Sequence, residues 1–114
     1  MGTKTDEKVG KYIQDYKDKI KGDLDVDLLR KVTEGCGPSI FNNDAEIVSG
    51  STESELATVR KNFLIEKLGL KDDEKLDAGI DAVMEKYGKS NRYKYRAVVY
   101  YMLTKHFKKE SVYN

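Results

Sequence analysis

Cys36 and His106 are the only cysteine and the only histidine of the chain, so covalent catalysis by a thiol would have to use both. A cysteine becomes a nucleophile when an imidazole base lies within hydrogen-bond reach of its sulfur. Cys36 belongs to a glycine-rich turn, whereas His106 lies near the C-terminal end, and no spacing or capping signal brings them together. We therefore expect the two residues to be separated and the protein not to be an enzyme.

Two further patterns match known ligand sites only superficially. Four acids fall at positions 1, 3, 5 and 12 of a calcium-binding loop, namely Asp23, Asp25, Asp27 and Glu34. Such a loop needs a glycine for its sharp turn where this chain has Leu28, so the acids fit a helix cap and a solvated edge better. Gly35 and Gly37 are followed by neither pattern of a phosphate-binding loop. The sequence predicts no metal ion and no cofactor.

The C-terminal part of the chain is strongly basic. Residues 86–114 hold 8 of the 21 basic residues and 1 of the 20 acidic ones, and tyrosines alternate with the charges at 92–96. Basic side chains neutralise phosphates and tyrosines stack on unpaired bases, so an exposed patch of this kind could hold RNA or single-stranded DNA. The candidate contact residues for nucleic acid or a protein partner are Lys89, Arg92, Lys94, Tyr95, Arg96, Lys105 and Lys108.

An alternative interpretation assigns the same cations to the fold. Acids recur every four residues before the basic segment and would line one helical face, at Asp73, Asp77, Asp81 and Glu85. If the last helix folds back, part of the basic cluster would face this acidic stripe or another neighbouring acid. Surface ion pairs of this kind contribute about 0 to 1 kcal/mol each, so they would tune packing without creating it.

The elements that must position these residues are helices. Apolar residues recur at helical spacing in segments that glycines end, and no segment alternates long enough to predict a strand. The first helix is expected from Thr5 to Gly22 and the second from an Asp25 cap to Gly35. The third is expected from a Thr52 and Glu55 capping box to Gly69. The fourth runs from Asp72 to Gly88, and the last from Ser90 or Asn91 to about Lys108. The stretch between the second and third is expected to be an irregular connector whose Ile47 and Val48 plug the core. The fold class is all-α, a small irregular or orthogonal bundle of five or six helices.

The last expected helix has seven consecutive apolar residues, 97–103, and a helix that is apolar all round is usually buried. It should therefore lie inside the bundle. The expected core comprises Leu56, Val59, Phe63, Leu64, Ile80, Val83, Ala97, Tyr100, Leu103 and Phe107.

Length and composition predict one domain over residues 1–114, with residues 1–4 disordered. The charges nearly cancel, with 21 basic and 20 acidic residues, so net charge alone does not point to nucleic acid. A single cysteine suits a reducing compartment, and neither a signal peptide nor a membrane-spanning run is present. We expect a soluble cytoplasmic protein without a membrane partner.

Three separated blocks of sequence carry a family resemblance. They are GPSIFN at 37–42, VSGS at 48–51 with ELATV at 55–59 and NFLI at 62–65, and EKYGKSNR at 85–92 with the stretch that follows to Phe107. In this order the blocks resemble a bacterial family catalogued as domain of unknown function 2853. The resemblance implies a small all-helical protein in a bacterial cytoplasm, and it carries over no catalytic residue.

These observations together favour a small non-enzymatic protein-interaction module, with self-association as one form of its activity. The alternative is binding of RNA or single-stranded DNA through the basic, tyrosine-rich C-terminal helix.

Overall fold

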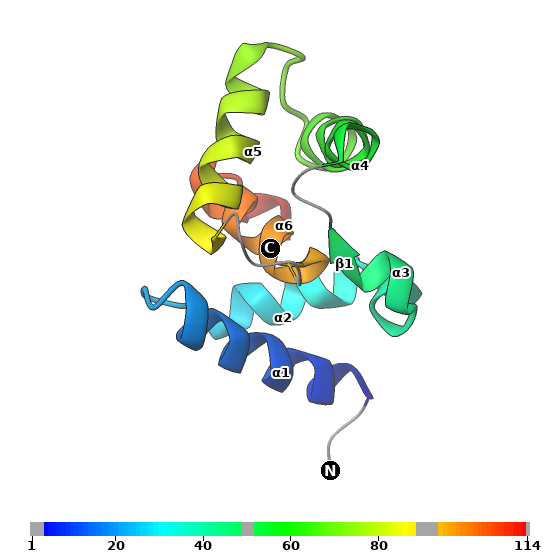
Figure 1. Ribbon diagram of the computed structural model, residues 1–114, viewed down its shortest axis with the longest axis vertical. Coiled ribbons are helices and arrows are strands. Elements are labelled where there is room, and N and C mark those ends of the chain that lie inside the picture. The colour runs from blue at the N-terminus through cyan, green and yellow to red at the C-terminus, as the bar shows by residue number, and fades with distance from the viewer. Residues whose placement is uncertain (1–3, 49–51, 89–93, 114) are drawn as a thin grey trace.

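Helix α6 (Arg96–His106) lies at the centre of the fold in the computed structural model, which describes residues 4–48, 52–88 and 94–113 (Figure 1). Its buried residues fall on every face of the helix: Ala97, Val98, Val99, Tyr101, Met102, Leu103 and Thr104. The expected burial of the apolar run is confirmed. The helix begins at Arg96, later than expected, because the two residues before it are extended.

Helices α1 (Lys4–Lys19) and α2 (Val26–Gly35) form the expected hairpin on one side of α6. Helix α1 already includes Lys4, which the sequence assigned to a disordered end, and residues 1–3 lie outside the described residues. Asp25 caps α2 as expected, because its Oδ1 accepts a hydrogen bond of 3.1 Å from the Leu28 N–H. The two helices cover α6 with the buried side chains of Val9, Tyr12, Tyr16, Leu28, Leu29, Val32 and Thr33.

The connector contains a short 3₁₀ turn η1 (Gly37–Phe41), helix α3 (Asn43–Glu46) and strand β1 (Ile47–Val48). Strand β1 pairs antiparallel with β2 (Lys94–Tyr95), Ile47 opposite Tyr95 and Val48 opposite Lys94. The expectation of no strand was therefore wrong for these four residues. A two-residue strand is too short to produce an alternating pattern that a sequence could display. The apolar plug is confirmed at Val48, which is fully buried.

The expected helix after Thr52 is present but changes its winding. It starts as α4 (Glu53–Thr58) and continues as a π-helix, η2 (Val59–Lys67). At about 3.6 residues per turn an α-helix would put Val59 and Leu68 on roughly opposite sides, although both are buried. The wider π turn, with i→i+5 bonds such as Leu68 N–H to the Phe63 carbonyl, brings them to one face. The apolar spacing thus fits a π-helix better than the continuous α-helix that the sequence suggested.

Helix α5 (Glu74–Tyr87) follows a turn at Gly69, whose φ of +71° suits glycine. Its expected apolar stripe is confirmed, with Leu76, Ile80, Val83, Met84 and Tyr87 all buried. Gly79 is buried beside the end of α6, where an added Cβ would lie 2.3 Å from the Phe107 ring. The chain ends in a second 3₁₀ turn, η3 (Glu110–Tyr113), which packs against α2. The all-α class is confirmed.

The expected core is confirmed for seven of its ten residues, which are buried. The other three, Leu56, Tyr100 and Phe107, are partly buried and pack against the core from its edge. Tyr100 stays at the edge because its hydroxyl accepts a hydrogen bond from Arg96.

Replacement of Leu64 by alanine should lower the free energy of unfolding by about 2 to 5 kcal/mol, because the side chain is fully buried and its loss leaves a cavity. Leu56→Ala is the matched control, since Leu56 is only partly buried in the same helical segment. Urea denaturation followed by circular dichroism measures both variants. Equal losses would contradict the assignment of Leu64 to the core and Leu56 to its edge.

Candidate functional site

The basic residues that the sequence singled out are dispersed through the structure. Lys89 and Arg92 lie outside the described residues. Lys94 sits in β2 and is only 3% exposed, and burial together with the charge of Lys19 lowers its pKa. A lysine so enclosed is not placed to meet a phosphate from solvent. The expected continuous basic surface therefore does not form at Lys94.

Arg96 is committed to the interior of the fold. Its Nε donates to the Ala45 carbonyl at 2.6 Å, and its two terminal nitrogens donate to Tyr100 Oη at 2.9 Å and Glu55 Oε1 at 2.6 Å. The Tyr100 ring in turn stacks on Phe63 with centroids 3.9 Å apart. Arg96 thus ties the start of α6 to α3 and α4. Glu55 is the neighbouring acid with which Arg96 forms an ion pair. In the acidic stripe of α5, Asp77 pairs instead with Arg60, whose Nε lies 3.1 Å from the Asp77 carboxylate.

Tyr95 and the buried acid Glu46 belong to a polar layer between α1 and α3. Glu46 Oε2 accepts 2.6 Å from Tyr12 Oη and 2.9 Å from Lys8 Nζ. Burial alone would raise the pKa of Glu46, but these two bonds and the charges of Lys11 and Lys8 outweigh it, so its pKa lies below the usual range. The Tyr95 ring packs 5.0 Å from that of Tyr12, with the Lys11 ammonium 4.7 Å above it. The half-buried Tyr95 side chain therefore packs against its neighbours in the fold.

Lys105 and Lys108 are the two described candidates that remain open to solvent. Lys105 lies 3.7 Å from Glu110, and both side chains are more than two-fifths exposed, so this pair is a weak one. Lys108 has a φ of +56° just after the end of α6. The candidates thus divide into interior residues on the N-terminal side of α6 and exposed residues at its C-terminal end.

The possible catalytic residues lie in different environments. Cys36 is half-buried between α2 and η1, where burial raises the pKa of its thiol to about 11 against the opposing charge of Arg96. That is the reverse of what a reactive thiolate needs. His106 is exposed in the last turn of α6, with its ring 4.8 Å from that of Phe107.

Helix α2 begins at Val26, so the acids at 23–27 flank a regular helix start and not a calcium loop.

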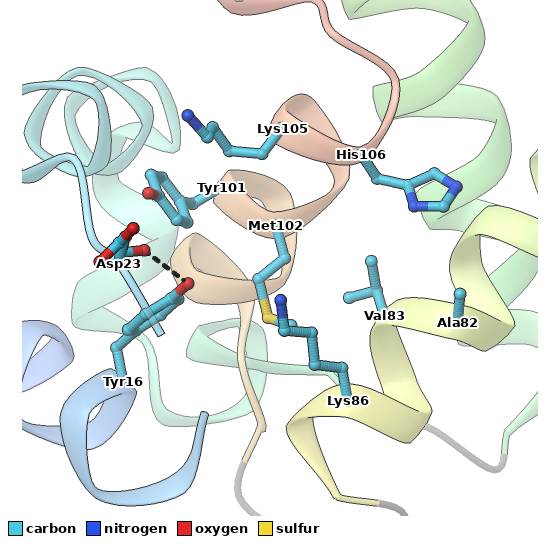
Figure 2. A pocket seen from close by; sticks show the side chains of 9 residues that line it. All are labelled: Tyr16, Asp23, Ala82, Val83, Lys86, Tyr101, Met102, Lys105 and His106. Carbon is cyan, nitrogen blue, oxygen red and sulfur yellow. Dashed lines mark hydrogen bonds between the residues drawn. The ribbon is translucent and has the colours of Figure 1, made fainter. Parts of the chain in front are cut away.

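A cleft of about 460 Å³ opens where α5, α6 and the end of α1 meet (Figure 2). Its lining residues combine an apolar and aromatic floor with charged edges: Tyr16, Asp23, Ala82, Val83, Lys86, Tyr101, Met102, Lys105 and His106. In Figure 2 Tyr16, Tyr101 and Asp23 stand on one side, Val83, Ala82 and His106 on the other, and Met102 and Lys86 between them. A cavity of this size with few polar groups around an apolar floor is typical of binding sites.

The aromatic floor of the cleft is held rigidly. The rings of Tyr16 and Tyr101 meet edge to face, with centroids 5.6 Å apart and an angle of 87°. The Tyr16 hydroxyl donates 3.0 Å to the carbonyl of Asp23, and the Tyr101 hydroxyl accepts 2.9 Å from the N–H of Asp25. Burial, with the neighbouring Tyr101 and Asp23, raises the pKa of Tyr16, so its hydroxyl remains a donor. Both hydroxyls are therefore used by the fold.

The charged edges of the cleft are mainly basic. Lys86 comes from the last turn of α5, and Lys105 and His106 come from the last turn of α6. Asp23 is the acid among the lining residues. Of this group the sequence singled out only Lys105 as a contact residue. The sequence does show basic residues in the last turns of two successive helices. Whether these residues come together depends on how α5 crosses α6, which the sequence does not reveal.

The fold and the cleft define a small all-α domain with a basic, apolar-floored cleft between helix ends. The family model described as "Protein of unknown function (DUF2853)" matches residues 11–111, and the chain belongs to that family. No curated protein matches the chain. In the part of the chain that the structure describes, no helix is long and apolar enough to cross a membrane.

Replacement of Glu46 by glutamine should lower stability at neutral pH by about 1 to 3 kcal/mol, because charge-assisted bonds to Tyr12 and Lys8 lose their acceptor charge. The folded state lowers the pKa of Glu46 below its ordinary value of about 4.3, so the contribution is fully present above that pH and is lost as the pH falls through the folded pKa. Urea denaturation between about pH 7 and 3 should show that the free energies of unfolding of the parent protein and of Glu46→Gln converge in acid.

Asp44→Asn is the control for this experiment, because Asp44 is an exposed acid in the same short helix. This substitution should change the free energy of unfolding little at any pH. If the difference in free energy of unfolding between the parent protein and Glu46→Gln stays constant from neutral to acid pH, the Glu46 charge does not stabilise the fold.

Proposed function

We propose that this domain is a small non-enzymatic protein-interaction module, and that its cleft binds a partner segment carrying both acidic and apolar side chains. The observation that carries the proposal is the composition of the cleft: Met102, Val83 and two tyrosine rings form its floor, and Lys86, Lys105 and His106 form its edges. Apolar floors contribute affinity through burial, and surrounding charges contribute orientation and association rate.

The cations of the cleft are better suited to carboxylates than to a nucleic-acid backbone. Of the candidates for phosphate contact, Lys94 is buried, and the Arg96 side chain already bonds to the Ala45 carbonyl, Tyr100 and Glu55. The rings of Tyr16 and Tyr101 are nearly fully buried and pack on each other, so they offer little face for stacking on a base. These features support a protein partner over the alternative of RNA or single-stranded DNA bound through the basic, tyrosine-rich C-terminal helix.

The non-enzymatic part of the proposal is supported by Cys36. Its thiol has a pKa raised to about 11, and it is not among the residues that line the cleft with His106. The family resemblance and the single cysteine also lead us to place the domain in a bacterial cytoplasm, where a reducing environment keeps a lone thiol free.

Titration of the isotope-labelled protein with a short Glu-Leu-Asp-Ile-Glu peptide should shift the backbone amide signals of Tyr101, Met102 and Lys105. Lys86→Glu combined with Lys105→Glu should weaken binding at least tenfold, because two favourable charges become repulsive. Affinity should fall as salt rises from about 50 to 500 mM, since exposed charges are screened.

Two comparisons make this test decisive. A Lys-Leu-Lys-Ile-Lys peptide of the same apolar content should not bind, and the matched variant Lys61→Glu with Lys71→Glu, exposed residues outside the cleft lining, should bind like the parent. Tighter binding of single-stranded RNA at the same amides would favour the nucleic-acid alternative. An absence of shifts with either ligand at millimolar concentration would refute the cleft as an interaction site.

A further inference from the structure

The chain itself exposes a segment with the chemistry that the cleft would bind. Asp23, Asp25, Val26 and Asp27 are all exposed and form what we call the acidic edge, residues 23–27. Val26 is 42% exposed, and among the described residues it is one of two exposed large apolar side chains, with Phe41 at 48%. Val26 has an exposed carboxylate on each side, whereas Phe41 lies between Ile40 and Asn42.

The acidic edge is fixed beside the cleft by the same tyrosines that form the cleft floor. The hydroxyls of Tyr16 and Tyr101 hold the backbone of Asp23 and Asp25 respectively, and Asp25 is also the cap of α2. Asp23 contributes to the wall of the cleft, while Val26 and Asp27 are not among its lining residues. With its backbone held at two points and the Asp25 side chain engaged in the cap of α2, the edge is not free to fold over into the cleft of its own chain.

Each copy therefore presents a basic, apolar-floored cleft and an acidic, apolar edge next to each other. We propose that the cleft of one copy receives the acidic edge of a second copy, and that the reciprocal contact closes a two-fold symmetric dimer. In such an interface a residue of the cleft contacts the edge of the partner while the partner's cleft contacts the first edge. The proposal rests on the proposed function and names the partner of the cleft as a second copy of this chain.

The expected dimer is weak and depends on salt. Its ion pairs would join exposed lysines to exposed aspartates, and such pairs at the edge of an interface are screened by ions. Val26 supplies one aliphatic anchor for the floor around Met102. Both contacts occur twice in a symmetric dimer, so a substitution in one site acts on both halves of the interface.

A charge-exchange experiment followed by sedimentation velocity tests the proposal. At about 50 mM salt the parent protein should shift from monomer to dimer as its concentration rises, and about 500 mM salt should reverse this. Lys86→Glu with Lys105→Glu should stay monomeric, as should Asp23→Lys with Asp27→Lys, because each places like charges opposite each other twice. An equimolar mixture of the two variants should form a one-to-one dimer, since every contact is again between opposite charges.

Restored association of the mixture shows that both variants are folded, and circular dichroism of each checks this separately. Lys61→Glu with Lys71→Glu changes the same number of charges elsewhere and should dimerise like the parent. A monomeric parent protein at high concentration and low salt would overturn the proposal, as would assemblies larger than a dimer in the mixture, which indicate head-to-tail contacts. If the parent stays monomeric but the acidic peptide still binds the cleft, only self-association fails and the proposed function stands.

Discussion

A helix that is apolar on every face is stable in water only when other elements cover all of it, and α6 sets this condition for the whole chain. Helices α1, α2 and α5 and the β1–β2 pair are the elements that cover it. At its start the Arg96 side chain bonds to α3 and α4, and at its end the carbonyls of Leu103, Thr104 and Lys105 accept from the N–H groups of the residues that follow the helix. The connector, the polar layer and the cleft all follow from this requirement.

Tyrosine joins the layers of this small bundle, because its ring fills the core while its hydroxyl reaches a polar partner. Tyr12 donates to Glu46, Tyr87 donates to Asp15 while accepting from the Tyr95 N–H, and Tyr101 accepts from Asp25. The bonds to Glu46, Asp15 and Asp25 connect residues far apart in the sequence. Tyr12, Tyr87 and Tyr101 therefore connect elements of the fold, whereas of the two tyrosines at 92–96 that suggested stacking on bases, Tyr93 lies outside the described residues.

The sequence predicts those parts of the fold that depend on local periodicity. The faces of α1, α2 and α5, the Asp25 cap and the burial of α6 are all visible as spacing or as single capping residues. The β1–β2 pair and the burial of Lys94 depend on contacts between distant segments, whereas the π winding after Thr58 follows the local apolar spacing, which was interpreted as that of an α-helix. The cleft belongs to this second group, since Lys86 and Lys105 come together only through the crossing of α5 and α6.

The position of these cations at helix ends also bears on the proposed binding of a carboxylate in the cleft. Lys86 and Lys105 lie in the last turns of α5 and α6, where positive charge already interacts favourably with the carbonyl ends of the helices. A carboxylate that enters the cleft shares these cations with the helix ends, so each contact contributes less than an isolated pair would. The apolar floor presents only a small surface to such a ligand, because Val83, Tyr16, Tyr101 and Met102 are each at most 6% exposed. On the proposed function, affinity would therefore be modest, with charge favouring an acidic partner.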